Sequence, residues 1–133
     1  MINLWRGAKD ALKSSNHDAL RHFSVSLREL LTHVIHKLSP DASVSSWSNS
    51  PDHFHNGRPT RKTRLLYICK GINHDPFDDF VLKDIDALLT CIHIFEKGTH
   101  VLSPVFIKSQ TELLLSRVES YIGFLIRTWK ETK

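Results

Sequence analysis

Residues 16–38 read NHDALRHFSVSLRELLTHVIHKL, and this stretch contains neither glycine nor proline. Its apolar residues recur at steps of three and four, the spacing of one face of an α-helix. They are Leu20, Phe23, Leu27, Leu30, Leu31, Val34 and Leu38. Ser15 or Asn16 is typical of a helix start, and Pro40 disfavours helical geometry in the residue before it. We therefore predict one long amphipathic helix over residues 16–38.

A different side of this predicted helix carries a polar stripe. Four of its polar residues fall within about 60° of one another around the helix axis, and two arginines flank them. The six residues are His22, Glu29, His33, His36, Arg21 and Arg28. A helix that only covered a core would not need three histidines and two arginines together. We expect a functional face, and the alternative is a solvated face in which Glu29 and His33 form an ordinary i,i+4 pair.

Composition bounds the class of protein. A chain of 133 residues with 41% hydrophobic residues is the size of one domain, residues 1–133, and can bury a core. A helix with a large aromatic residue directly after Met1 suggests a domain excised from a longer protein, with a naturally short protein as the alternative. The apolar runs are far shorter than the roughly 20 residues of a membrane-spanning helix, and the N-terminus does not resemble a signal peptide. We expect a cytoplasmic protein without membrane association.

The rest of the chain predicts further helices at residues 4–14, 60–71, 75–97 and 109–130. Pro59 suits the first turn of the third helix, Gly98 ends the fourth, and Ser109 to Glu112 has the spacing of a capping box. Residues 39–58 are rich in Ser, Asn, Asp, Pro and His and predict a long ordered loop. No segment alternates as a strand would. The predicted fold is an all-α bundle of about five helices with no internal repeat.

Charge is unevenly distributed along this chain of net charge +4. Between His53 and His74 lie five basic residues and no acid, whereas residues 75–96 carry six acids and only Lys83. The five are Arg58, Arg61, Lys62, Arg64 and Lys70. The pattern equally suits a nucleic-acid surface and pairing of basic with acidic helices, within the chain or across a dimer.

If this basic run is a nucleic-acid surface, we predict four nucleic-acid-binding residues, with two aromatic residues of the loop nearby for base stacking. The four are Arg58, Arg61, Lys62 and Arg64, and the two aromatic residues are Trp47 and Phe54.

The strongest chemical motif is Arg28 followed by His33, with four residues between them. In RNA cleavage without a metal, the 2′-hydroxyl attacks the neighbouring phosphate, a group with pKa near 7 moves the proton, and a permanent cation stabilises the phosphoryl oxygens. Positions five apart on a helix lie about 140° apart, so the two side chains frame a groove. We predict Arg28 and His33 as catalytic residues, supported by Glu29, His36 and His22.

Other chemistry is weakly indicated. His33 with His36, or His53 with His55, could ligate a metal, but no set of three or four ligands has a recognisable spacing. A glycine-rich phosphate loop and a nucleophile elbow are both missing from the sequence. We expect no metal and no cofactor. Cys69 and Cys91 lie in apolar helical context and are expected to be buried thiols.

Two family resemblances follow from these motifs. The Arg28-x4-His33 helix in a small all-α bundle resembles the HEPN ribonucleases of toxin and antiphage defence systems. These ribonucleases usually act as dimers. The resemblance therefore implies a site at a dimer interface, where two copies reach one phosphate. Three segments, LWRGA (residues 4–8), SLRELLTHV (26–34) and GRPTR (57–61), make nearly the whole chain similar to the predicted pPIWI-associating nuclease domain.

These resemblances imply a metal-independent endoribonuclease of a bacterial antiphage or toxin-type defence system. Its partners would be RNA, a second copy of the chain, and further domains of a larger defence protein. The alternative is a non-catalytic helical module of a defence protein that serves for oligomerisation, docking or nucleic-acid binding.

Overall fold

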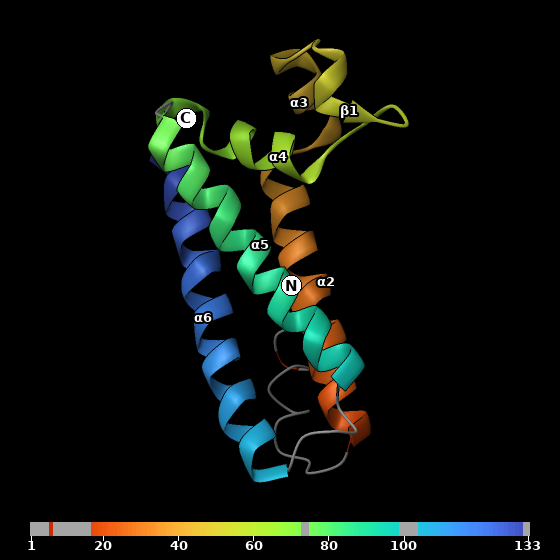
Figure 1. Ribbon diagram of the computed structural model, residues 1–133. Coiled ribbons are helices and arrows are strands. Elements are labelled where there is room, and N and C mark those ends of the chain that lie inside the picture. Colours follow the sequence, from red (N-terminus) through yellow and green to blue (C-terminus); the bar gives the residue numbers. More distant parts are fainter. Residues whose placement is uncertain (1–5, 7–16, 73–74, 99–103, 132–133) are drawn as a thin grey trace.

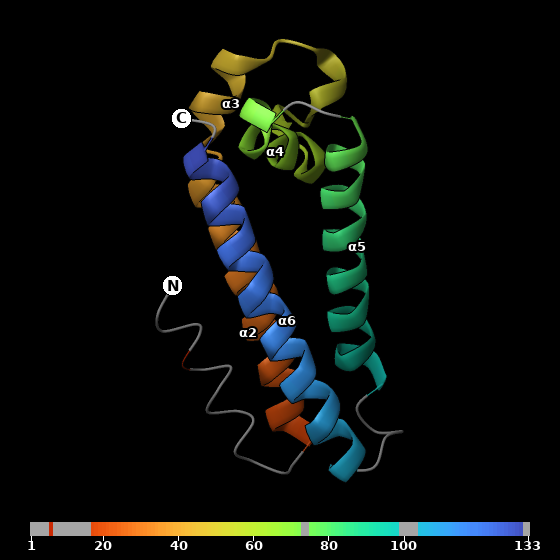
Figure 2. The same ribbon diagram turned by 90° about the vertical axis from the view of Figure 1, so that its left-hand side faces the viewer.

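The computed structural model describes Arg6 and residues 17–72, 75–98 and 104–131. Three long helices lie side by side in it, as Figures 1 and 2 show from two directions. They are α2 (His17–Leu38), α5 (Asp75–Gly98) and α6 (Pro104–Glu131). The predicted helix at residues 4–14 lies outside the described residues, apart from Arg6. The all-α bundle is confirmed.

Helix α2 packs against both other long helices and supplies much of the core. Six of the seven residues of its predicted apolar face are buried, namely Phe23, Leu27, Leu30, Leu31, Val34 and Leu38, and the side chain of Leu20 lies outside the described residues. The facing residues are Val81, Ile85 and Leu88 of α5 and Leu114, Val118, Tyr121 and Leu125 of α6. Burying one such aliphatic side chain contributes about 1.5–3 kcal/mol, so this face stabilises the bundle. The buried Tyr121 hydroxyl donates to the carbonyl oxygen of Val81 at 3.3 Å, which leaves it satisfied.

The shorter elements gather at one end of the three long helices, where α2 ends and α5 begins (Figure 1). The predicted loop between the second and third helices contains α3 (Asp41–Trp47), a 3-10 turn (Pro51–His53) and the strands β1 (Phe54–His55) and β2 (Arg58–Pro59). The two strands pair antiparallel, with Phe54 opposite Pro59. Helix α4 (Arg61–Ile68) and a second 3-10 turn (Lys70–Ile72) complete this end.

This hairpin corrects the prediction that the chain has no strand. Asn56 and Gly57 join the strands with φ angles of 52° and 77°. A two-residue turn of this kind needs positive φ at both positions, and Asn-Gly is the dipeptide that adopts it most readily. The strands are too short for an alternating pattern to show in the sequence. The Asn56-Gly57 dipeptide was therefore the sequence feature that could have predicted the hairpin.

Two helix starts also differ from prediction. Thr60 caps α4, because its Oγ1 accepts a hydrogen bond from the Thr63 backbone N–H at 3.1 Å. Pro59 therefore lies before the cap, in β2, rather than in the first turn. Helix α6 begins at Pro104, whose fixed φ suits a first helical residue, so the expected start at Ser109 falls inside the helix.

Cys69 confirms the prediction of a buried thiol. Burial raises its pKa to about 12, so the unreactive thiol form persists at neutral pH. The side chain of Cys91 lies outside the described residues. Within the described helices, none is both long and apolar enough to cross a membrane.

Candidate nucleic-acid site on helix α2

The polar face of α2 forms an open hollow of about 540 Å³. Its lining is Arg28, Glu29, Thr32, His33 and His36, all of them exposed. Both predicted catalytic residues and two of the three supporting residues therefore share one hollow. His22 is also exposed on α2, but it lies six residues before Arg28 and does not line it.

Helix geometry orders the side chains around this hollow. At 100° per residue, Arg28 and His33 mark its two edges, about 140° apart, and Thr32 and His36 project between them. A permanent cation, a carboxylate, a hydroxyl and two imidazoles thus surround a space open to solvent. Those groups can stabilise phosphate charge and transfer protons. In the part of the chain that the structure describes, no group of three or more His, Cys, Asp or Glu is placed to hold a metal ion.

A second, smaller hollow adjoins the first. It has a volume of about 150 Å³ and is lined by Thr32, Ile35, His36, Pro59, Arg61 and Arg64. Thr32 and His36 belong to both linings, so the two hollows meet at these residues. The junction of β2 and α4 thereby brings Arg61, a predicted nucleic-acid-binding residue, to the α2 face. The same junction explains why Ile35, which the predicted apolar stripe omitted, is buried.

Arg64 has a different position from the other predicted cations. It is only 2% exposed, and its Nη1 donates to the carbonyl oxygen of Ser39 at 2.6 Å. Its Nη2 also donates to the carboxylate of Asp41. Arg64 therefore ties the end of α2 to the start of α3, and this burial keeps its charge from a phosphate at the surface.

Of the four cations predicted to bind nucleic acid, Arg58, Arg61 and Lys62 are exposed. Arg58 shares the Asp41 carboxylate with Arg64, at 3.5 Å between Nε and Oδ2. The acid that pairs with these two arginines thus lies on α3, whereas the predicted pairing was with the acidic helix α5. On α5, Asp84 pairs with Arg117 of α6.

His36 lies where these charges meet. Partial burial lowers its pKa, the nearby Arg64, Arg58 and His33 lower it further, and Asp41 opposes them. The hydrogen bond from Arg64 in turn holds the pKa of the Asp41 carboxyl below its usual range, so this acid is ionised at neutral pH. These effects favour the uncharged form of the His36 imidazole.

The aromatic residues predicted for base stacking lie apart from both hollows. Trp47 is 40% exposed and stacks on His53, with ring centres 6.0 Å apart and planes within 5°. The edge of Tyr67 approaches Trp47 from α4, and Lys70 holds its Nζ 4.1 Å from the Tyr67 ring centre. These contacts give Lys70 a cation–π partner within the fold.

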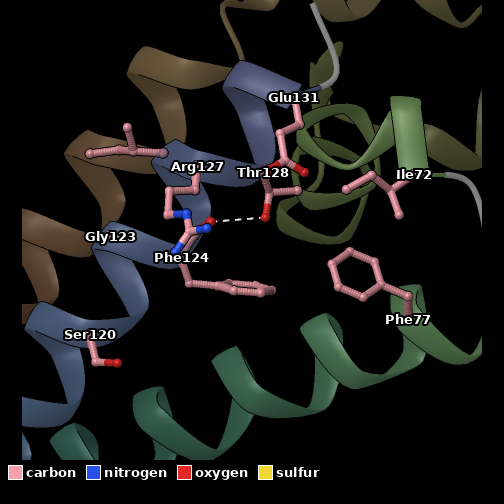
Figure 3. Close-up of a pocket in the computed structure, with 9 residues that line it drawn as sticks. Ile72, Phe77, Ser120, Gly123, Phe124, Arg127, Thr128 and Glu131 are labelled. Atoms are coloured by element: carbon pink, nitrogen blue, oxygen red, sulfur yellow. Dashed lines mark hydrogen bonds between the residues drawn. The ribbon is translucent and has the colours of Figure 1, made fainter.

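A third hollow, which the sequence did not suggest, has a volume of about 730 Å³ and lies between α6 and the start of α5. Figure 3 shows the rings of Phe77 and Phe124 facing one another inside it, with centres 5.8 Å apart. Arg127 and Glu131 add opposite charges to its lining. It contains none of the predicted site residues.

Comparison with known families supports the whole-chain resemblance. The model of the family described as "Predicted pPIWI-associating nuclease" matches residues 1–125. No curated protein and no solved structure matches the chain. The matched range includes the polar face of α2, the hairpin and α4, and therefore every residue of the two adjoining hollows. The chain belongs to the family of predicted pPIWI-associating nucleases.

Proposed function

We propose that this domain is a metal-independent, HEPN-like endoribonuclease that acts in the cytoplasm within a bacterial antiphage or toxin-type defence system. The family description supports a nuclease. The observation that carries the proposal is the shared hollow: Arg28 and His33 line it together, and it continues past His36 to Arg61. Basic and proton-transferring groups are what a phosphodiester site needs.

In the proposed reaction, the 2′-hydroxyl of RNA attacks the adjacent phosphorus and displaces the 5′-oxygen. Arg28 stabilises the charge on the non-bridging oxygens, His33 transfers a proton, and Arg61 holds a neighbouring phosphate. The ordinary pKa of an imidazole suits proton transfer near neutral pH. The product is a 2′,3′-cyclic phosphate or its hydrolysis product.

The direct test is cleavage of a defined RNA in excess EDTA. We expect cleavage to persist and its product to carry a 2′,3′-cyclic phosphate, since the attacking oxygen belongs to the substrate. The same oligonucleotide with a deoxyribose at the cleaved position should resist cleavage, which provides the substrate control. Loss of cleavage in EDTA would contradict a metal-independent mechanism. Cleavage of the deoxyribose substrate would contradict attack by the 2′-hydroxyl.

A triple substitution of the exposed basic residues Arg58, Arg61 and Lys62 by alanine should weaken RNA binding. Each lost phosphate contact is expected to flatten the dependence of log K on log salt concentration by about 0.7 for single-stranded RNA. Binding would be measured by fluorescence anisotropy between 50 and about 200 mM salt. The control removes the same charge from α5 and α6 through Lys83→Ala, Arg127→Ala and Lys130→Ala. Equal losses in both triple variants would show that only net charge matters.

The domain is expected to form a homodimer, because two copies of the α2 face around a twofold axis could reach one phosphate. Light scattering at micromolar concentration measures this directly. A strict monomer would remove the basis for a two-copy site, and cleavage would then have to occur within one chain.

The third hollow favours a second function, a docking or oligomerisation module of a larger defence protein. Phe80 and Leu113 are 50% and 72% exposed, and Phe80 meets Phe124 edge-on at 6.1 Å between ring centres. Leu113 and Phe124 lie within about 20° of each other around α6 but about 16 Å apart along its axis, with Arg117 and Ser120 between them, so they are two separate apolar positions on one side of the helix.

The double variant Phe80→Glu and Leu113→Glu separates the two functions. A dimer that persists supports an interface on α2, whereas a folded monomer supports association through the α5–α6 surface. Glu119→Lys, a charge change on another face of α6, is the matched control.

A further inference from the structure

Two histidines, rather than one, share the proposed active site. His33 and His36 both line the 540 Å³ hollow. Three residues apart on one helix, they lie about 60° apart around the axis and about 4.5 Å apart along it, the spacing of side chains that face the same substrate. Cleavage of RNA by an attacking 2′-hydroxyl needs one group to take a proton and another to give one, so within one α2 helix His33 by itself leaves one role unfilled.

The surroundings of the two histidines differ. Of the two histidines, only His36 lines both hollows, and the groups around it come from every element packed there. These groups are Arg64 and Arg61 of α4, Arg58 of β2, Asp41 of α3 and His33 of α2. Arg64 and Arg58 share the one carboxylate of Asp41, which leaves an excess of positive charge around the His36 imidazole. On the side of His33, Glu29 lies one turn earlier on the same helix.

We propose that His36 is the proton acceptor of this site and His33 the proton donor, so that a single α2 helix supplies both catalytic imidazoles. The inference rests on the proposed ribonuclease function. It limits the substrate to nucleic acid with a 2′-hydroxyl next to the cleaved phosphate.

The protons and bonds balance in one step. An unprotonated ring nitrogen of His36 takes the 2′-hydroxyl proton, and the 2′-oxygen forms a bond to phosphorus. The bond from phosphorus to the 5′-oxygen breaks, and that oxygen leaves with a proton from the His33 imidazolium. His36 ends protonated and His33 neutral, and exchange with water restores both. A lowered pKa favours the unprotonated form of His36, which an acceptor requires.

The test is the pH dependence of kcat/KM for RNA cleavage by the whole chain, in the oligomeric state that it has in solution. The wild-type profile should be bell-shaped, with its acidic limb due to His36. His36→Gln should lower kcat/KM by about 10²-fold or more and remove the acidic limb. Added imidazole should partly restore cleavage by His36→Ala. Lys37→Ala, an exposed substitution on α2 outside both linings, should keep the bell shape.

The outcomes separate this inference from the proposed function. If His33→Ala is inactive while His36→Gln keeps the wild-type rate and both limbs, the two-histidine site is overturned and the ribonuclease function stands. If wild-type protein does not cleave RNA, both are overturned. If His33→Ala cleaves RNA as fast as the wild type, the roles assigned to His33 and to the two-histidine site are overturned, and the cleavage occurs elsewhere in the chain. A ¹H–¹³C NMR titration gives an independent reading, because His36 should titrate below pH 6.5 in the free protein. A His36 that titrates above that value overturns its role as acceptor.

Discussion

Replacing His33 by alanine is expected to abolish RNA cleavage, with a loss of at least about 10²-fold in kcat, because no other group would replace its proton transfer. Arg28→Ala should cause a loss of similar or larger size, since about 2.7–4 kcal/mol of transition-state stabilisation is typical for one such charge-stabilising group. Both side chains are exposed on α2, so the free energy of unfolding should change by less than about 1 kcal/mol.

The measurement pairs cleavage rates with urea denaturation of the same protein samples. Lys37→Ala, an exposed basic residue on α2 outside both linings, is the matched control and should retain activity. Full activity in the His33→Ala protein would show that His33 is not catalytic, whereas a wild-type protein that does not cleave RNA would favour the docking module over the enzyme.

Leu31→Ala should lower the stability of the fold and leave the chemistry of the site unchanged. Leu31 is 0% exposed in the core, and truncation of a buried leucine costs about 2–5 kcal/mol through lost burial and the cavity left behind. For a domain of this size such a loss is a large part of the total stability, so the midpoint of urea unfolding should fall sharply. Activity per folded molecule should stay close to that of the wild type.

Thr32→Ala, an exposed change at the next position of α2, is the stability control and should shift unfolding by less than about 0.5 kcal/mol. A stable Leu31→Ala protein would contradict the packing of α2 described above. A stable but inactive one would assign Leu31 a role in the site.

Which residues of α2 are buried and which are exposed could be predicted from the sequence, because helix periodicity is a local property. Leu27 and Leu31 are buried while Arg28 and His33 are exposed, as their spacing implied. The Asn56-Gly57 turn was equally local, and it was missed because strands of two residues have no visible alternation.

The local sequence pattern could not predict which arginines of the basic segment are buried. Arg61 and Arg64 are three residues apart on α4, and the sequence treats them alike. Both line the hollow beside His36, but Arg64 is buried and donates to Ser39 and Asp41, while Arg61 is exposed. Which arginine faces inward depends on the side of α4 that meets the end of α2, and no residue near α4 in the chain determines that.

The sequence by itself determined the helices, the two faces of α2 and the motif of Arg28 and His33, since each depends on neighbours within one or two helical turns. Only the tertiary structure joined that motif to Arg61, covered Ile35 and surrounded His36 with cations. Those relations arise from packing between segments more than 20 residues apart, such as Ser39 and Arg64, and the charge around a side chain depends on distance in space rather than along the chain.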